Sequence, residues 1–353
     1  MTTNQDFDPD ATLLDASDLS VEFDTDAGTL VAVDGVDFRV REGETVCLVG
    51  ESGSGKTVAT ESITRLIQEP PGRIDGSVEF RGRDLLEMAD RELRAVRGNR
   101  IAHIFQNPQE AMNHTFTVGW QIAEAIQVHE DVPDAEARAR AVDLLDRVGI
   151  DNASARFDDY PHEFSGGQKQ RVMIAMALVG NPDLLLADEP TTALDVTVQA
   201  QILRLLEDLQ EEFGMGILFV THDLGVVAEI ADRVVVMYAG KVMERGDVYR
   251  IFEKPAHPYT QALMRCLPGR SDDSGGIPGS LPDPTDPPSG CRFAERCEHA
   301  IEACTVGKQP PEFPVEDGHS ASCVYYGSGY DSTVVADVDI ETDETTAQEA
   351  TDD

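Results

Sequence analysis

Hydrophobic positions follow two different spacings along this chain, and the two spacings alternate. Between residues 19 and 38, two segments of alternating apolar residues predict a pair of antiparallel strands. Residues 45–49 form a continuous apolar run, which is typical of a strand buried on both faces. Beyond residue 165 the spacing predicts, in order, a helix, a strand at 184–187, a helix at 196–213, a strand at 216–220, a helix and a strand at 234–238. This alternation predicts an α/β fold with a mainly parallel sheet covered by helices.

Changes in composition divide the chain into four predicted parts. Residues 1–15 form an acidic leader, and residues 16–254 carry the α/β pattern. Within that domain, residues from about 107 to 164 have helical periodicity, which predicts a helical insertion. Residues 255–325 are dense in Pro, Gly and Cys and predict an irregular C-terminal domain. Residues 326–353 are mostly acidic or small, which predicts a disordered acidic tail.

Acidic residues outnumber basic ones throughout the chain. The 353 residues include 66 Asp and Glu against 28 Lys and Arg, a formal net charge of −38, and only five of the basic residues are Lys. This charge would repel nucleic acid and anionic lipid, which argues against a general DNA-binding role. An acid-rich, Lys-poor composition is typical of halophilic proteins, because molar salt screens charge repulsion to within about 3 Å. We therefore predict a halophile-like proteome as the source.

The sequence contains neither a membrane span nor a secretory signal. No run of about 18 apolar residues occurs. The first residues are polar and acidic, whereas a secretory signal starts with a basic and then an apolar segment. We therefore expect a cytosolic protein whose six cysteines are free thiols or metal ligands rather than disulfides.

A glycine-rich motif follows the apolar run at residues 45–49. The sequence GESGSGKT at residues 50–57 lies between a predicted strand and a predicted helix, the context that a phosphate-binding loop requires. Its backbone N–H groups would cradle phosphate, Lys56 would reach the β- and γ-phosphates, and the Thr57 hydroxyl would ligate Mg²⁺. The residues predicted to bind ATP here are Gly50, Ser52, Gly53, Ser54, Gly55, Lys56 and Thr57.

Two adjacent carboxylates follow a second apolar run, at residues 184–187. Asp188 and Glu189 come at the carboxyl end of a predicted buried strand, where ligands bind in open α/β sheets. We expect Asp188 to hold Mg²⁺ through water. We expect Glu189 to polarise the attacking water as a general base.

The stretch FSGGQ at residues 164–168, followed by KQR, resembles the signature motif of ABC-transporter ATPases. The resemblance implies a P-loop NTPase fold with a RecA-like core, an antiparallel β subdomain, a helical insertion and an irregular, Cys-containing C-terminal extension. It also implies that the signature motif contacts the ATP held by the opposite subunit. A helix N-terminus with glycine amides suits phosphate binding. The residues concerned are Ser165, Gly166, Gly167 and Gln168.

Four further residues match family positions. Gln106 occupies the Q-loop position and would sense the γ-phosphate and Mg²⁺. Asp195 occupies the D-loop position and would couple the two active sites, and His222 matches the switch histidine that contacts the γ-phosphate. Phe23 lies 27 residues before Gly50 and is our candidate for the aromatic ring that stacks on adenine.

The region after residue 255 resembles the C-terminal domain of oligopeptide/dipeptide importer ATPases. The similarity lies at residues 255–263, 290–297 and 318–323, and together with the core it covers about residues 16–325. Residues 171–178 and 191–201 look like the D-type of the two ATPase subunits in such importers. The resemblance implies a heterodimer with an F-type ATPase at the cytoplasmic face of the cell membrane, together with two permease subunits and an external solute-binding protein.

Four cysteines of the extension have the composition of a metal site but not a common spacing. Neither the zinc-type C-x₂-C spacing nor the ferredoxin run occurs. Some relatives bind a [4Fe–4S] cluster through matching cysteines, and the resemblance implies the same here. Structural zinc and unligated thiols are the alternatives. The residues are Cys291, Cys297, Cys304 and Cys323.

The resemblance implies an ATP-hydrolysing subunit that powers the import of di- and oligopeptides. A subunit of the same family that imports a sugar or nickel is an alternative, because the ATPase never touches the cargo. A soluble ABC ATPase of DNA repair or translation is disfavoured, because long coiled coils and a second core are lacking and the charge opposes nucleic acid.

Overall fold

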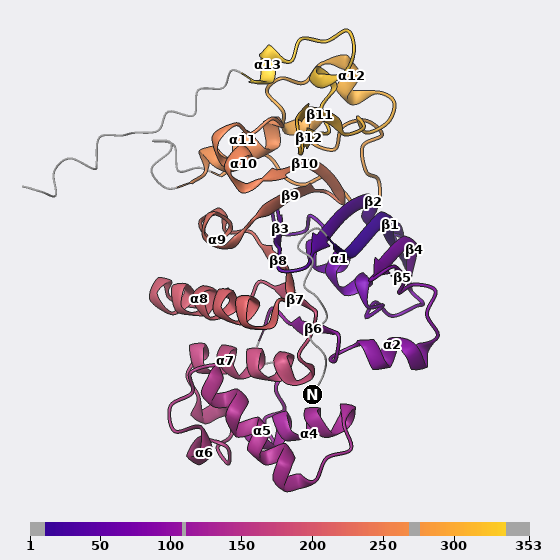
Figure 1. Ribbon diagram of the computed structural model, residues 1–353. Coiled ribbons are helices and arrows are strands. Elements are labelled where there is room, and N and C mark those ends of the chain that lie inside the picture. The colour runs from indigo at the N-terminus through magenta and orange to yellow at the C-terminus, as the bar shows by residue number, and fades with distance from the viewer. Residues whose placement is uncertain (1–10, 108–110, 268–275, 337–353) are drawn as a thin grey trace, which may run out of the picture.

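The computed structural model of the protein describes residues 11–107, 111–267 and 276–336 (Figure 1). A smaller antiparallel sheet near the N-terminus has the strand order β2-β1-β4-β5. Its longest pairing, between β1 and β2, confirms the predicted antiparallel pair. The bounds are β1 (Thr12–Thr25), β2 (Gly28–Arg41), β4 (Gly72–Phe80) and β5 (Arg83–Asp84).

A larger mixed sheet forms the centre of the molecule, with the order β11-β12-β10-β9-β3-β8-β7-β6. The strands from β9 to β6 run parallel, whereas β10, β12 and β11 add antiparallel at one edge. The parallel part confirms the predicted α/β sheet. The bounds are β3 (Thr45–Val49), β6 (Ile101–Ile104), β7 (Leu184–Asp188), β8 (Gly216–Thr221), β9 (Arg233–Tyr238), β10 (Lys241–Asp247), β11 (Phe313–Glu316) and β12 (His319–Ala321).

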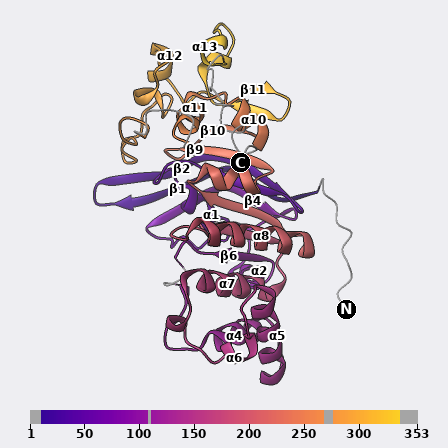
Figure 2. The ribbon, with the colours of Figure 1, turned by 90° about the vertical axis from the view of Figure 1, so that its left-hand side faces the viewer.

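Helices cover the larger sheet and extend beyond one end of it. Figure 2 shows α4, α5 and α6 at the end of the molecule opposite the C-terminal extension, which is where the predicted helical insertion lies. None of the helices in the described ranges is long and apolar enough to cross a membrane. The α-helices are α1 (Lys56–Ile63), α2 (Asp90–Val96), α4 (Val118–His129), α5 (Asp134–Arg147), α6 (Ala153–Arg156), α7 (Gly166–Ala177), α8 (Val196–Phe213), α9 (Leu224–Ile230), α10 (Val248–Glu253), α11 (Pro258–Arg265), α12 (Glu302–Thr305) and α13 (Thr333–Ala336). Short 3₁₀ turns are η1 (Pro161–Glu163), η2 (Leu178–Gly180), η3 (Ala294–Arg296) and η4 (Val324–Tyr326).

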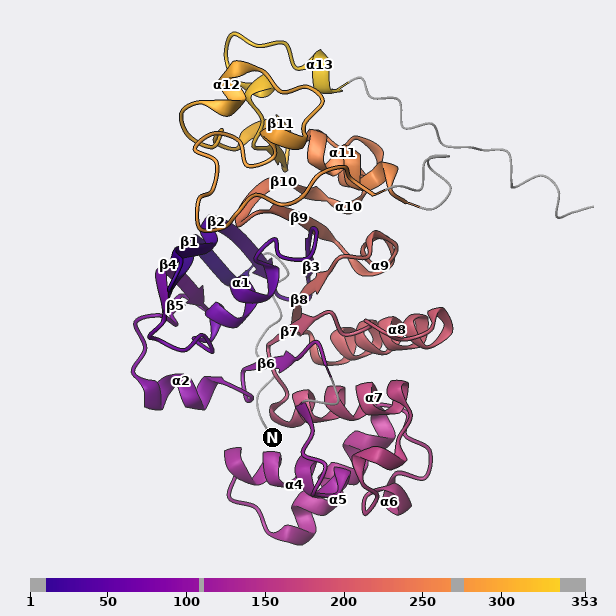
Figure 3. The ribbon, with the colours of Figure 1, turned by 180° about the vertical axis from the view of Figure 1, so that it is seen from behind.

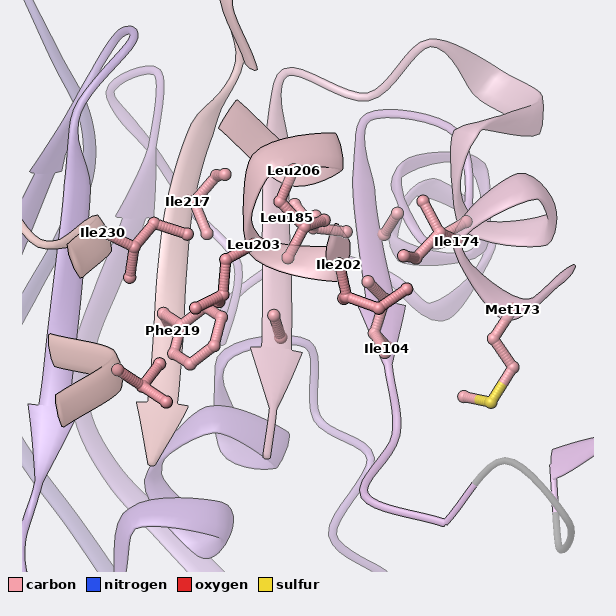
Figure 4. Close-up of a cluster of buried hydrophobic side chains, with 14 of the residues drawn as sticks. Ile104, Met173, Ile174, Leu185, Ile202, Leu203, Leu206, Ile217, Phe219 and Ile230 are labelled. Carbon is pink, nitrogen blue, oxygen red and sulfur yellow. The ribbon is translucent and has the colours of Figure 1, made fainter. Parts of the chain in front are cut away.

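The parallel strands separate two hydrophobic cores. In β3, Cys47 and Val49 join one core, and Val46 and Leu48 join the other, which confirms that this run is buried on both faces. The first core packs the sheet against α7, α8 and α9, and Figure 4 shows part of it. The second core packs the sheet against α1 and the smaller sheet. Because successive side chains of a strand point to opposite faces, one apolar strand serves both cores.

The C-terminal extension shares the sheet of the ATPase part. Strand β12 pairs with β10, so the extension continues the sheet and covers an edge that would otherwise be open. The fully buried Glu244 of β10 anchors it. Its carboxylate accepts hydrogen bonds from the backbone N–H groups of Ala256 and His257, both at 2.7 Å, and hydrogen-bonds to His319 Nε2 at 2.7 Å. A buried carboxylate with this many partners strongly fixes the segments that supply them.

Two predicted boundaries are wrong. Strand β1 begins at Thr12 with buried residues at 13 and 14, so it takes up part of the predicted leader 1–15. At the other end, Val335 is buried and its carbonyl accepts a hydrogen bond from Gln261 Nε2 at 2.5 Å, so part of the predicted tail 326–353 packs on the extension. In each case a few apolar residues are enough to hold the segment against the rest of the fold. The mean composition of an acidic segment does not reveal them. Residues 1–10 and 337–353 lie outside the described residues.

Candidate nucleotide-binding site

The predicted phosphate loop joins β3 to α1 and has a backbone that requires glycine. Gly50 has φ 153°, and a Cβ there would lie 2.1 Å from the Met237 carbonyl oxygen. Gly55 has φ 95°, and a Cβ there would lie 2.3 Å from the Ala32 carbonyl oxygen. Neither position can carry a side chain. Helix α1 begins at Lys56, so its first N–H groups point toward the loop and favour an anion there.

Lys56 lies at the base of the loop. Its ammonium group donates hydrogen bonds to the carbonyl oxygens of Gly50 at 2.7 Å and Glu51 at 3.0 Å. Burial lowers the pKa of Lys56, while the nearby carboxylates of Glu189 and Asp188 act in the opposite direction. The ammonium group is therefore buried beside the loop, with a carboxylate pair close by.

A cavity of about 540 Å³ lies over the phosphate loop, a size typical of small-molecule sites. Its walls include the predicted residues Ser52, Gly53, Ser54, Gly55, Lys56, Thr57, Gln106 and Glu189. They also include residues to which the sequence analysis gave no role: Leu30, Val31, Ala32, Ala239, Gly240, Leu281, Pro282, Asp283, Pro284 and Pro287.

Phe23 does not line this cavity. Its ring packs against the second core beside Gly72, where an added Cβ would lie 3.3 Å from the Phe23 ring. The predicted stacking of Phe23 on adenine therefore has no support from its position. The sequence spacing located a strand residue but did not show which way its ring points.

Asp188 and Thr57 lie together beside the loop. Burial raises the pKa of Asp188, and a hydrogen bond with Thr57 partly offsets this. The Oδ1 atom of Asp188 is buried and has no hydrogen-bond partner. A buried carboxylate oxygen without a partner is costly unless a cation or water satisfies it. An oxygen-rich pair of this kind fits Mg²⁺, which commonly binds one carboxylate together with substrate phosphates.

Glu189, on the cavity wall, forms hydrogen bonds with three side chains. Its Oε2 accepts hydrogen bonds from Gln106 Nε2 and from Thr192 Oγ1, both at 2.9 Å. Its Oε1 lies 2.9 Å from His222 Nδ1 and hydrogen-bonds to it. Gln106, Glu189 and His222 follow the carboxyl ends of the neighbouring parallel strands β6, β7 and β8, which is why they meet. Thr192 was not predicted as a site residue, although a hydroxyl three residues after a strand-end carboxylate is a signal visible in the sequence.

The hydrogen bonds to Glu189 decide its charge. Burial acts to raise the pKa of Glu189, but the hydrogen bonds from His222 and Thr192, with help from Gln106, leave it below its ordinary value. The carboxylate is therefore ionised near neutral pH. Its backbone has φ 45°, in the left-handed region that costs energy for a residue with a side chain. An ionised, constrained carboxylate at a phosphate site can act as a proton acceptor.

The predicted signature residues lie away from this cavity. Ser165 caps α7: its Oγ accepts from the Gln168 N–H at 3.4 Å, and its own N–H donates to Gln168 Oε1 at 3.0 Å. Ser165 and Gly166 are exposed. A Cβ at Gly167 would lie 2.5 Å from Val198 Cγ1, so this glycine allows α7 to pack closely on α8.

Asp195 is exposed and caps α8. Its Oδ1 accepts a hydrogen bond from the Val198 N–H at 3.0 Å. It too lies outside the set of residues that line the cavity of its own chain. Ser165 and Asp195 are therefore both held by local helix caps, and neither lines the cavity over the phosphate loop of its own chain.

Two residues of the extension contact the phosphate loop, and neither was predicted as a site residue. The Tyr259 hydroxyl accepts a hydrogen bond from the Glu51 N–H at 2.9 Å. Arg296 forms a bidentate ion pair with the Glu51 carboxylate, at 2.6 and 3.1 Å. These partners lie 208 and 245 positions apart in the chain, so no local spacing could reveal them.

The four cysteines of the extension surround one small cavity, which His257, His299 and Tyr325 also line. All four thiols are free, and burial raises the pKa of Cys297 to about 11 and of Cys291 and Cys323 to about 12. Within the described residues, no group of three or more His, Cys, Asp or Glu is arranged to hold a metal ion. The structure thus brings the four residues together but gives no further support to the predicted iron–sulfur cluster.

Comparison with known families and structures gives consistent matches. A family model described as ABC transporter matches residues 33–192, and one for the C-terminal region of oligopeptide/dipeptide transporters matches residues 243–304. The solved dimeric structure of the ATP-binding cassette MJ0796 bound to ADP and Pi is 28% identical, with a TM-score of 0.60, and the match covers 67% of this chain and 98% of that one. The structure of cbiO1 from Clostridium perfringens, part of the ABC transporter complex cbiONQ, is 28% identical, with a TM-score of 0.58 over 69% of this chain and 91% of that one.

Curated relatives match over almost the whole chain. A protein of Brucella abortus (strain 2308), named as a peptide import ATP-binding protein, is 49% identical over 316 residues, which are 89% of this chain and 95% of the relative. A protein of Sinorhizobium fredii, named as a peptide ABC transporter ATP-binding protein, is 49% identical over 88% of this chain and 94% of its own length. With its P-loop ABC fold and both family regions, the chain belongs to the ATP-binding proteins of the ABC transporter family, in the oligopeptide/dipeptide group.

Proposed function

We propose that this protein is the ATP-hydrolysing subunit of a membrane importer of di- and oligopeptides. The observation that carries the proposal is the Glu189 carboxylate, ionised and joined to Gln106 and His222 at the mouth of the phosphate-loop cavity. The relatives named for peptide import support the peptide cargo over sugar or nickel. The match to the C-terminal region of oligopeptide/dipeptide transporters supports it as well.

Each cavity residue then has a role in hydrolysis. The loop amides and Lys56 bind the phosphates, and Thr57 and Asp188 hold Mg²⁺, which neutralises phosphate charge. Glu189 takes the proton of the attacking water. Its Oε1 has one hydrogen-bond partner, His222, so this oxygen can accept a further hydrogen bond from the attacking water. We infer that Gln106 and His222 position Glu189 relative to the γ-phosphate.

The signature residues act on a second chain in this proposal. Ser165 and Gly166 are exposed at the start of α7 and lie apart from the cavity of their own chain, which fits contact with a nucleotide held opposite. Asp195 would link the two sites. We propose a D-type subunit that pairs with an F-type ATPase and binds two permease subunits at the cytoplasmic membrane face, and that an external solute-binding protein delivers the peptide.

The four cysteines remain candidates for a [4Fe–4S] cluster. Their convergence on one cavity supports the proposal, and four thiolates are the usual ligands of such a cluster. Visible absorbance and iron content of the anaerobically purified protein distinguish a cluster from zinc or free thiols. The net charge of −38 supports the related proposal of a halophilic protein.

Substitution of the proposed base tests the function. Glu189→Gln removes the proton acceptor but keeps the side-chain shape, so we expect ATP turnover to fall by about 100-fold or more while MgATP still binds. The trapped ATP state should then accumulate as a dimer in size-exclusion chromatography with the partner ATPase. Exposed Glu211→Gln is the matched control, and turnover should stay at the wild-type rate there. Unchanged turnover in Glu189→Gln would remove Glu189 from this role.

A further inference from the structure

A segment of the C-terminal extension forms one wall of the nucleotide cavity. Residues 281–284 and 287 line it together with the phosphate loop. The Val31 N–H of β2 donates a hydrogen bond to the Pro284 carbonyl oxygen at 2.9 Å. Leu281 lies directly over Gly53, whose added Cβ would be 3.3 Å from Leu281 Cδ1. Figure 3 shows the chain of the extension descending to β2 at this point.

Arg296 anchors this wall to the phosphate loop. Its guanidinium pairs in bidentate fashion with the Glu51 carboxylate, and its side chain is 5% exposed. The same guanidinium donates hydrogen bonds to the carbonyl oxygens of Pro278 and Ile277, both at 2.8 Å. These two residues lie just before the wall segment. One buried, charge-assisted contact therefore positions the wall relative to the loop, which makes Arg296 a positioning residue.

The cavity has a polar end and an apolar end. Lys56, Thr57, Gln106 and Glu189 supply the polar end. The apolar side chains on its wall include Leu30, Val31, Val58, Leu281, Pro282, Pro284 and Pro287, and the Asp283 carboxylate lies among them. A nucleotide has the same division, with charged phosphates at one end and a flat base with apolar faces at the other. Phe23, which pairs with the lining residue Leu30, is not itself among the lining residues, so the apolar surface of the cavity consists of these side chains.

We propose that residues 281–287 of the extension form the wall that faces the base and ribose of ATP bound in the same chain. This inference rests on the proposed ATP site. The extension is then part of the catalytic cassette rather than a separate module beside it. Three of the seven wall residues are prolines, which cannot donate backbone hydrogen bonds. A wall poor in donors favours the amino group of adenine over the O6 acceptor of guanine, so we expect ATP to bind more tightly than GTP.

Binding measurements on the full chain test the wall. Leu281→Ser should weaken MgATP binding about tenfold, because it removes apolar contact with the base. Binding of inorganic tripolyphosphate should weaken much less, because that probe has no base. Val306→Ser, an exposed position of the same extension, is the control and should change neither affinity. Thermal melting verifies that each variant is folded.

Two results would overturn different claims. Failure of the wild-type chain to bind MgATP would remove the proposed function itself. Wild-type MgATP binding together with equal affinity in Leu281→Ser would remove the wall but leave the ATP site.

Photolabelling of the wild-type chain decides the question even if Leu281→Ser does not fold. With 8-azido-ATP, we expect label in the tryptic peptide of residues 271–292, which contains the wall. Label confined to the peptide of residues 1–39, which contains Phe23 and Val31, would contradict the inference.

Discussion

At the scale of single residues, the site depends on a few charged groups whose surroundings set their protonation. Glu189 is held ionised by hydrogen bonds, whereas Asp188 is pushed toward the neutral form by burial and has an oxygen without a partner. Adjacent in sequence, the two carboxylates therefore suit different tasks: one accepts a proton and the other holds a cation. Their identity was predictable from the strand-end motif. Their different roles were predicted as well, but the surroundings that set their charges were not, because Thr57, Gln106 and His222 lie on other elements.

The protonation of Lys56 gives a residue-scale prediction. Burial lowers its pKa below the ordinary 10.5, and only the charged ammonium attracts the phosphates of ATP. Affinity is therefore complete below the pKa of Lys56 in the free protein and is lost as pH rises through it. We expect the Kd for MgATP to start rising before pH 10.5, by at most about tenfold per pH unit. Fluorescence titration from pH 7 to 11 measures this. Lys56→Gln should bind weakly at every pH, and a wild-type Kd that stays flat to pH 10.5 would contradict the assignment.

At the scale of elements, helix caps and close packing place the signature motif. Ser165 caps α7 and Asp195 caps α8, so both motif residues also stabilise the first turn of a helix. Gly167 lets the two helices approach, since Val198 occupies the space of its missing side chain. The helical periodicity predicted both helices, and the bounds of α8 match the prediction. Their contact depends on tertiary packing, which periodicity does not contain.

The contact between α7 and α8 gives an element-scale prediction. Gly167→Ala places a methyl group against Val198 and should lower the free energy of unfolding by about 1–3 kcal/mol. Gly166→Ala is the matched control, because its Cβ meets only Leu194 at an ordinary 3.8 Å. Urea denaturation of both variants measures the difference. Adding Val198→Ala to Gly167→Ala should recover part of the loss, and equal stability of the two single variants would contradict the packing argument.

At the scale of the whole molecule, the extension and the ATPase core form one structure. They share a sheet through the β10–β12 pairing and a hydrophobic core that runs from the parallel strands to Phe293. The buried carboxylate of Glu244 joins the start of the extension to its last strand. A change in the extension can therefore reach the phosphate loop through Tyr259 and Arg296.

The charge of the molecule gives a prediction at this scale. With a net charge of −38, the acidic side chains repel one another. Salt shortens the screening length of this repulsion from about 10 Å at 0.1 M to about 3 Å at 1 M. Surface ion pairs weaken as well, but the excess of acidic residues makes repulsion the larger effect. We expect the thermal midpoint to rise steadily from 0.1 to 2 M KCl. Scanning calorimetry measures it, with sucrose as an uncharged control. A midpoint that is flat or falls with KCl would contradict the halophilic interpretation.

The sequence by itself determined the local chemistry: the glycine-rich loop, the strand-end carboxylates, the signature turn and the two-faced burial of the central strands. Each of these is encoded within a few residues, through backbone freedom, side-chain periodicity or charge. The tertiary structure decided what surrounds the nucleotide cavity. It packed Phe23 against the second core, placed Val335 in a buried contact and brought residues 281–287 and Arg296 to the phosphate loop. The contact of Arg296 with Glu51 joins residues 245 positions apart, and it exists only because the fold brings the extension beside the phosphate loop.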